Sequence, residues 1–126
     1  MVSAIEKARV FARKAVESQY DGVCTIVEHQ KVLKANKSTG FDDVTVAENL
    51  PCRLSFKTKA NADKNEIASS VSQIIEVFLN PEITVKAGSK LIITQNGFTT
   101  EYKSSGQPAV YSTHQEIVLE LFKEWA

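Results

Sequence analysis

This chain has few cysteine and tryptophan residues and no net charge. Its 126 residues include two cysteines, one tryptophan and three prolines. Two cysteines, Cys24 and Cys52, are too few for the disulfide framework of a small secreted domain, so we expect reduced thiols. Lys+Arg and Asp+Glu both total 15, giving a formal net charge of zero. The broad positive field on which most nucleic-acid binders depend is therefore missing.

Long apolar runs are also absent. No run approaches the roughly 20 residues of a membrane helix, and charged residues interrupt the N-terminal segment, so neither a membrane span nor an export signal is predicted. We expect a soluble protein that begins in the cytoplasm and has no membrane partner. The glycosylation acceptor Asn36-Lys37-Ser38 is then a chance match.

The residues that carry chemistry do not fall at useful spacings. Structural zinc sites take ligands as close pairs on tight turns, and the available set lacks such a pair: Cys24, His29, Cys52 and His114. A nucleophilic triad of Cys52, His114 and Glu116 lacks a turn that would present the thiol. We therefore predict no enzyme, no catalytic or metal-binding residues and no cofactor.

Turn residues dominate the second half of the chain. Asn96-Gly97, between alternating residues, is the strongest short-range signal of a hairpin, because both central residues of a tight primed turn need positive φ. Gly88 and Gly106 mark further turns between short apolar segments. Residues 81–126 therefore read as a run of β-hairpins.

The first half begins with a helix. Ser3 and Glu6 have the spacing of a capping box, and apolar residues then recur at helical spacing, which predicts a helix over residues 3–18. Its charged residues are interpreted as a solvated outer face: Lys7, Arg9, Arg13, Lys14 and Glu17. The length of the chain favours one domain over residues 1–126, with residues 1–20 as an N-terminal α-helix and 21–126 as a small antiparallel β-barrel.

Alternating or β-branched segments predict the strands of this mainly β fold. Residues 67–79 fit both a helical stripe and a strand face, and we favour a strand over 71–79. A long polar hairpin loop is expected at residues 34–43, and Cys52 is expected in the core. The other strands are predicted at residues 23–32, 44–46, 52–57, 83–85, 90–95, 99–103 and 110–122.

Two further segments draw attention. Residues 57–66 are polar and lack any large apolar anchor, so they are interpreted as a long inter-strand loop with a functional role. Near the C-terminus, Phe122 and Trp125 are large apolar groups that serve either a subunit contact or packing within the chain.

Several segments resemble a known family. The strand Asn49-Leu50-Pro51-Cys52-Arg53-Leu54-Ser55, the stretch from Pro81 to Gly97 and the ending from Val110 to Glu120 are similar to head-closure proteins of tailed bacteriophages and prophages of Gram-positive bacteria. These are also called head–tail connector or minor capsid proteins. The resemblance covers nearly all residues after Tyr20.

This resemblance implies a structural virion protein of the phage neck, assembled in the host cytoplasm. It implies a homo-oligomeric ring that seals the DNA-filled head and joins it to the tail. The implied partners are other copies of the chain, the adaptor and portal complex, the tail terminator or tail tube, and packaged DNA near the long loop. In that loop, the residues implied to line the channel are Lys57, Thr58, Lys59, Asp63, Lys64 and Glu66.

Two alternatives remain open. An adaptor or tail-terminator subunit of the same connector would share the location and the ring. A small single-stranded nucleic-acid-binding β-barrel is the other, and it requires basic and aromatic side chains on one face.

Overall fold

The computed structural model of the chain describes residues 3–33, 35–36, 38–60 and 71–125, and for residues 59, 60, 71 and 72 it describes the backbone alone. These residues form one helix and seven strands: α1 (Ala4–Glu17), β1 (Gly22–Leu33), β2 (Thr39–Ala60), β3 (Val71–Leu79), β4 (Lys90–Gln95), β5 (Phe98–Ser104), β6 (Ala109–Val110) and β7 (Gln115–Leu121).

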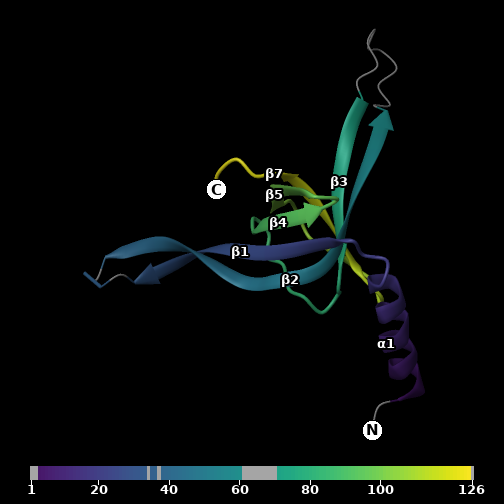
Figure 1. Cartoon of the computed structure of the whole chain (residues 1–126). Helices are drawn as coiled ribbons and strands as arrows, with labels where there is room; N and C mark the ends of the chain where they lie inside the picture. Colours follow the sequence, from purple (N-terminus) through teal and green to yellow (C-terminus); the bar gives the residue numbers. More distant parts are fainter. Residues whose placement is uncertain (1–2, 34, 37, 61–70, 126) are drawn as a thin grey trace.

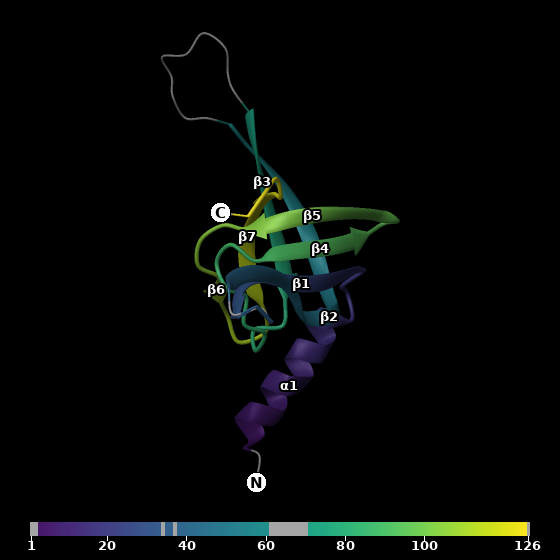
Figure 2. The same cartoon turned by 90° about the vertical axis from the view of Figure 1, so that its left-hand side faces the viewer.

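The strands form a closed antiparallel sheet. Hydrogen-bonded neighbours follow the order β3-β2-β1-β4-β5-β7, and β7 pairs back with β3. The short β6 pairs with β7 outside this ring. The prediction of a mainly β, antiparallel fold with an N-terminal helix is confirmed, and Figures 1 and 2 show the ring from two sides.

The hydrophobic core fills the inside of the ring. Alternate residues point inward, as a strand with one buried face requires; in β4 these are Leu91 and Ile93, both fully buried. Cys52 is fully buried as well, which confirms its predicted place in the core. The remaining core residues are Cys24, Ile26, Leu54, Val77, Leu79, Val85, Tyr102, Ile117 and Leu119.

The exceptional element is β2, which spans 22 residues and changes partner along its length. Residues 39–52 pair with β1, whereas residues 52–60 pair with β3. Cys52 belongs to both ladders, opposite Gly22 on one side and Leu79 on the other. Two hairpins therefore leave the ring in different directions (Figure 1).

We name the parts of these hairpins that extend beyond the ring. The first arm comprises residues 28–33 and 39–44, because β1 pairs with β4 only as far as Val27. The second arm comprises residues 57–60 and 71–74, because β3 pairs with β7 only from Ile75 onward. Each arm is a two-stranded ribbon.

Both long loops predicted from the sequence include residues that belong to strands in the structure. The first hairpin does project from the sheet, but residues 39–43 already pair with β1. Likewise Lys57, Thr58, Lys59 and Ala60 belong to β2 and pair with Ile74 to Val71, so the prediction that they are loop is wrong. A polar strand exposed on both faces lacks the alternation that identifies a strand. The other channel-loop candidates, Asp63, Lys64 and Glu66, lie outside the described residues.

The other predicted strands and turns are correct where neighbouring residues determine them and wrong where distant residues do. β3 and β4 have the predicted bounds, and Asn96 and Gly97 both have positive φ, as the hairpin turn requires. The predicted strand at residues 83–85 is wrong: the Gln115 amide donates to the Ile83 carbonyl at 2.6 Å in place of a neighbouring strand. The predicted strand at 110–122 is interrupted, because the Tyr111 N–H donates to the His114 carbonyl and closes a turn between β6 and β7.

The helix has the predicted boundaries. Ser3 caps it, and its Oγ accepts the Glu6 N–H at 3.1 Å. The helix ends at Ser18, whose N–H donates to the Lys14 carbonyl. No helix in the described part of the chain is long and apolar enough to cross a bilayer.

Close packing at the β2 partner change yields the first prediction. A Cβ added to Gly22 would lie 2.9 Å from the Cys52 carbonyl oxygen and 3.1 Å from the Cys52 Sγ. We expect Gly22→Ala to lower the free energy of unfolding by about 1–3 kcal/mol, because overpacking forces the two strands apart. Urea unfolding measures this loss. The neighbouring exposed variant Val23→Ala should lose less, and an equal loss in both would contradict the explanation.

Candidate assembly surfaces

The cysteines and histidines considered as metal ligands or catalytic groups are buried in the core or engaged with neighbouring side chains. Cys24 and Cys52 are fully buried in the core. His29 lies on the first arm, where its Nδ1 is 3.2 Å from the Asp43 carboxylate. His114 Nε2 is 3.1 Å from Glu116 Oε1, and its ring stacks on Tyr111. Within the described residues no group of three or more His, Cys, Asp or Glu side chains is arranged to hold a metal ion.

The C-terminal segment folds back onto the first arm. Trp125 stacks on His29 with ring centroids 4.9 Å apart, and Phe41 stacks on His29 at 4.7 Å. Phe122 meets Trp125 edge to face, and Lys90 Nζ is 4.4 Å from the centre of the Phe122 ring. Phe122 and Trp125, predicted as either subunit contacts or intrachain packing groups, thus make these contacts within the chain.

This aromatic cluster is a feature that the sequence reasoning missed. Phe41, His29, Phe122 and Trp125 come from three distant segments: the β1–β2 pairing brings Phe41 close to His29, and Trp125 reaches His29 from the C-terminal segment. The cluster shares its surface with Lys90, so it has one element of a nucleic-acid platform. However, the rings mostly stack on each other, and Lys90 also pairs with Glu101 at 3.4 Å.

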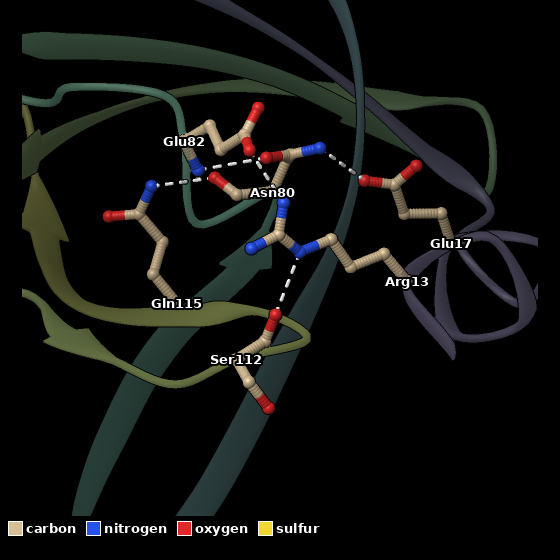
Figure 3. A network of polar contacts seen from close by, with 6 residues as sticks. All are labelled: Arg13, Glu17, Asn80, Glu82, Ser112 and Gln115. Atoms are coloured by element: carbon tan, nitrogen blue, oxygen red, sulfur yellow. Dashed lines mark hydrogen bonds and ion pairs between the residues drawn. The ribbon is translucent and has the colours of Figure 1, made fainter. Parts of the chain in front are cut away.

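The helix is fastened to the domain through its polar side, opposite to the orientation expected from the sequence (Figure 3). The Arg13 guanidinium donates to the Ser112 carbonyl and to Glu82 Oε1, both at 2.7 Å. Glu17 Oε1 accepts from the Asn80 amide at 2.9 Å. Arg13 and Glu17 lie one turn apart on one helix face. The interpretation of both as solvated outer residues is therefore wrong.

The same network reaches the ring. The Asn80 side chain accepts the Glu82 N–H at 2.8 Å, and the Asn80 carbonyl accepts from the buried Gln115 amide at 2.8 Å (Figure 3). Gln115 belongs to β7 and is 1% exposed. The orientation of α1 is thus connected by hydrogen bonds to a core position.

The side of α1 opposite Arg13 and Glu17 carries most of its apolar residues and faces solvent, whereas Ala12 and Val16, beside the anchored side, are half-buried. None of the helix residues is buried. Ile5 is 66% exposed and Phe11 is 76% exposed. These two side chains and Ala8, Ala12 and Ala15 recur at the three- and four-residue spacing that forms one helix face. We call these five residues the apolar face of α1. In both views α1 extends away from the strands (Figures 1 and 2).

Strand edges form the second kind of open surface. Among the described strands, residues 39–51 of β2 pair only with β1, and residues 53–60 pair only with β3. At Leu54 the Gln95 side chain substitutes for a missing strand: its Oε1 accepts the Leu54 N–H at 2.7 Å. Unpaired strand edges are templates for pairing or covering by another chain.

The second arm carries the described members of the predicted channel loop. Lys57 Nζ is 3.5 Å from Glu76 Oε1 on the paired strand. Because side chains alternate along a strand, Arg53, Ser55 and Lys57 share one face of β2. Thr58 lies on the opposite face.

Comparisons with known proteins reveal a likeness in fold but no relative in sequence. No protein-family model and no curated protein matches the chain. The chain is similar to the solved structure of the phage-like element PBSX protein xkdH from Bacillus subtilis, with a TM-score of 0.49 and 12% sequence identity. The match covers 82% of this chain and 96% of xkdH. At this TM-score the likeness carries no argument about function.

The polar network yields a prediction about α1. We expect Arg13→Ala to accelerate amide hydrogen exchange throughout α1, because the helix loses its bonds to Ser112 and Glu82. Glu82 is 74% exposed, so global stability should fall by no more than about 1 kcal/mol. Lys14→Ala removes a cation from the same helix without touching these partners and serves as the control. Unchanged α1 exchange in Arg13→Ala would contradict the network's role.

The buried cysteines yield a prediction about pH dependence and thiol reactivity. The hydrogen bond with Cys52, followed by burial, raises the pKa of the Cys24 thiol. The folded state therefore holds this proton more tightly than the unfolded state. The resulting stabilisation is present below the ordinary thiol pKa of about 8.5 and is lost as the pH rises above it.

Since the thiolate is the reactive species, both thiols should resist iodoacetamide in the native protein and react after unfolding in urea. Mass spectrometry of the alkylated chain measures this directly. Rapid native alkylation of Cys24 would contradict its placement, and the unfolded protein controls for the activity of the reagent.

Proposed function

We propose that this chain is a ring-forming structural subunit of a phage neck, which closes the DNA-filled head and joins it to the tail. The observation that carries the proposal is the number of surfaces that one copy leaves unpartnered. These are the apolar face of α1, the open edges of β2 and two ribbon arms. A protein built this way is suited to assembly.

Physical chemistry explains why these elements need neighbours. A two-stranded ribbon is at best marginally stable alone in water, and so is an isolated helix of 14 residues. Covering a side chain such as Phe11 contributes about 1.5–3 kcal/mol. Contacts between copies therefore stabilise the parts of the chain that its own core does not.

The phage context comes from the sequence resemblance, which covers nearly all of the ring strands. It supports a virion location at the neck, assembly in the host cytoplasm, and partners that include the portal and adaptor complex and the tail terminator or tail tube. We assign the chain no catalytic activity and no cofactor.

The second arm is the candidate channel element. Lys57 on this arm, and Arg53 on the same face of β2 nearer the ring, would be repeated in every copy of a ring, and repetition turns a modest charge pattern into a substantial field. In this proposal, second arms from neighbouring copies narrow the channel against packaged DNA and move aside when the tail docks or DNA leaves. An adaptor or tail-terminator subunit would use the same open surfaces without blocking the channel.

Single-stranded nucleic-acid binding is a second candidate, favoured by one observation. Lys90 lies over the aromatic cluster that contains Phe122 and Trp125, and such a combination accepts stacked bases.

The two candidates separate in one experiment. Purified protein is mixed with DNA-filled heads that lack this subunit, and attachment is followed by light scattering and negative-stain microscopy. We expect a ring at the portal vertex and retained DNA. A protein that ignores heads and binds single-stranded oligonucleotides would overturn the neck proposal and favour the second candidate.

The role of the second arm is tested by shortening it in register. Residues 58–73 are replaced by Asn-Gly, so that the paired residues Lys57 and Ile74 flank the new turn. We expect this variant to fold, form the ring and attach to heads, because its core is intact, but to let packaged DNA escape. Full DNA retention would contradict a plugging arm and favour the adaptor or tail-terminator role. Lys57→Ala alone serves as a control for charge without a change in length.

A further inference from the structure

The apolar face of α1 and the open β2 edge are complementary surfaces. We propose that α1 of one copy packs along residues 39–51 of β2 in the next copy, in a head-to-tail contact. This inference rests on the proposed function, because it identifies the contact that joins the copies.

The donor surface is defined by α1. Ile5 and Phe11 project from its apolar face, and the exposed cations Lys7, Arg9 and Lys14 flank that face. Arg13 and Glu17 are engaged with the helix's own domain. That anchoring fixes the direction of the apolar face, which points away from the strands of the same copy.

The acceptor surface is defined by β2. Residues 39–51 carry three acidic side chains, Asp42, Asp43 and Glu48, and no Lys or Arg. Two apolar side chains lie among them: Phe41, which also stacks on His29, is still 56% exposed, and Val46 is 42% exposed. The backbone of this segment pairs with β1 on one side only.

Charge and apolar pattern therefore match between the two surfaces. The helix offers a basic rim around apolar groups, and the strand segment offers acidic groups around exposed apolar ones. Opposite charges across an interface steer association and exclude wrong partners. Covering an edge strand with a helix is also one of the ways in which proteins block uncontrolled strand pairing.

The contact joins two different patches, so it repeats. A copy whose helix is engaged still has a free β2 edge, and its partner still has a free helix. Such heterologous contacts give a ring when the rotation closes. An anionic membrane is the competing occupant for a basic amphipathic helix, but it would leave the acidic β2 edge uncovered.

The test uses two variants that are each defective in one half of the contact. The helix variant combines Ile5→Ser with Phe11→Ser. The edge variant combines Asp42→Lys with Glu48→Lys. Circular dichroism and urea unfolding confirm that each variant folds. Phe98→Ser, which changes an exposed aromatic on another hairpin, and Asp21→Lys with Glu120→Lys, which change exposed acids outside the two surfaces, are the matched controls.

Assembly of the full chain is measured by light scattering and analytical ultracentrifugation. We expect the wild type and both controls to form multimers of the 13.9 kDa chain. Each defective variant alone should assemble about tenfold more weakly or not at all. Their mixture should form a one-to-one dimer, because one copy supplies an intact helix and the other an intact edge. A second protein that carries Lys7→Glu and Lys14→Glu should bind to the edge variant, because its acidic helix rim faces the two new lysines.

The contrary results are distinct. Variants that assemble like the wild type, or a mixture that forms no dimers, would overturn the helix-to-edge contact. If the wild type still attaches to heads in that case, the neck proposal stands. A wild type that neither self-associates nor attaches to heads would overturn both. Binding of the monomer to phosphatidylserine vesicles, lost in the helix variant, would identify a membrane as the occupant and also overturn the contact.

Discussion

The change of partner along β2 is the constraint on which the rest of the molecule depends. Up to Cys52 the strand pairs with β1, and from Cys52 onward it pairs with β3. The approach of Gly22 to Cys52 allows the two ladders to meet, since even a methyl group there would contact the Cys52 carbonyl. Because each ladder continues past the ring, one long strand produces two arms that point in different directions (Figure 1).

Each half of β2 therefore has a partner on one side and an open edge on the other. The core stabilises only the middle of the strand, around Cys52 and Leu54. Beyond it, stability depends on what covers the ribbons. The helix shows the same division, since Arg13 and Glu17 hold it by polar contacts while Ile5 and Phe11 are left exposed. One copy of the chain thus has a complete core and an incomplete periphery, which is the physical basis for assigning it to an assembly.

Features set by neighbouring residues were predictable from the sequence. Ser3 caps the helix, Asn96 and Gly97 adopt the turn, and β3 and β4 have the expected bounds. Features set by distant residues were not. Lys57 and Thr58 are in a strand because residues 73 and 74 lie opposite, and residues 83–85 satisfy their backbone through Gln115. Lys7, Arg9 and Lys14 are exposed as predicted, but the prediction for Arg13 failed for the same reason, because Glu82 and Ser112 lie far along the chain from it.

Hydrogen exchange of the full chain, free and bound to DNA-filled heads, tests most directly whether the exposed periphery is an assembly surface. If it is, α1 and residues 39–51 of β2 become protected on the heads, while the slow exchange of core strands such as β4 stays the same. If the chain binds heads and these segments exchange as fast as in the free protein, then α1 and the β2 edge are not the surfaces that join it to its neighbours.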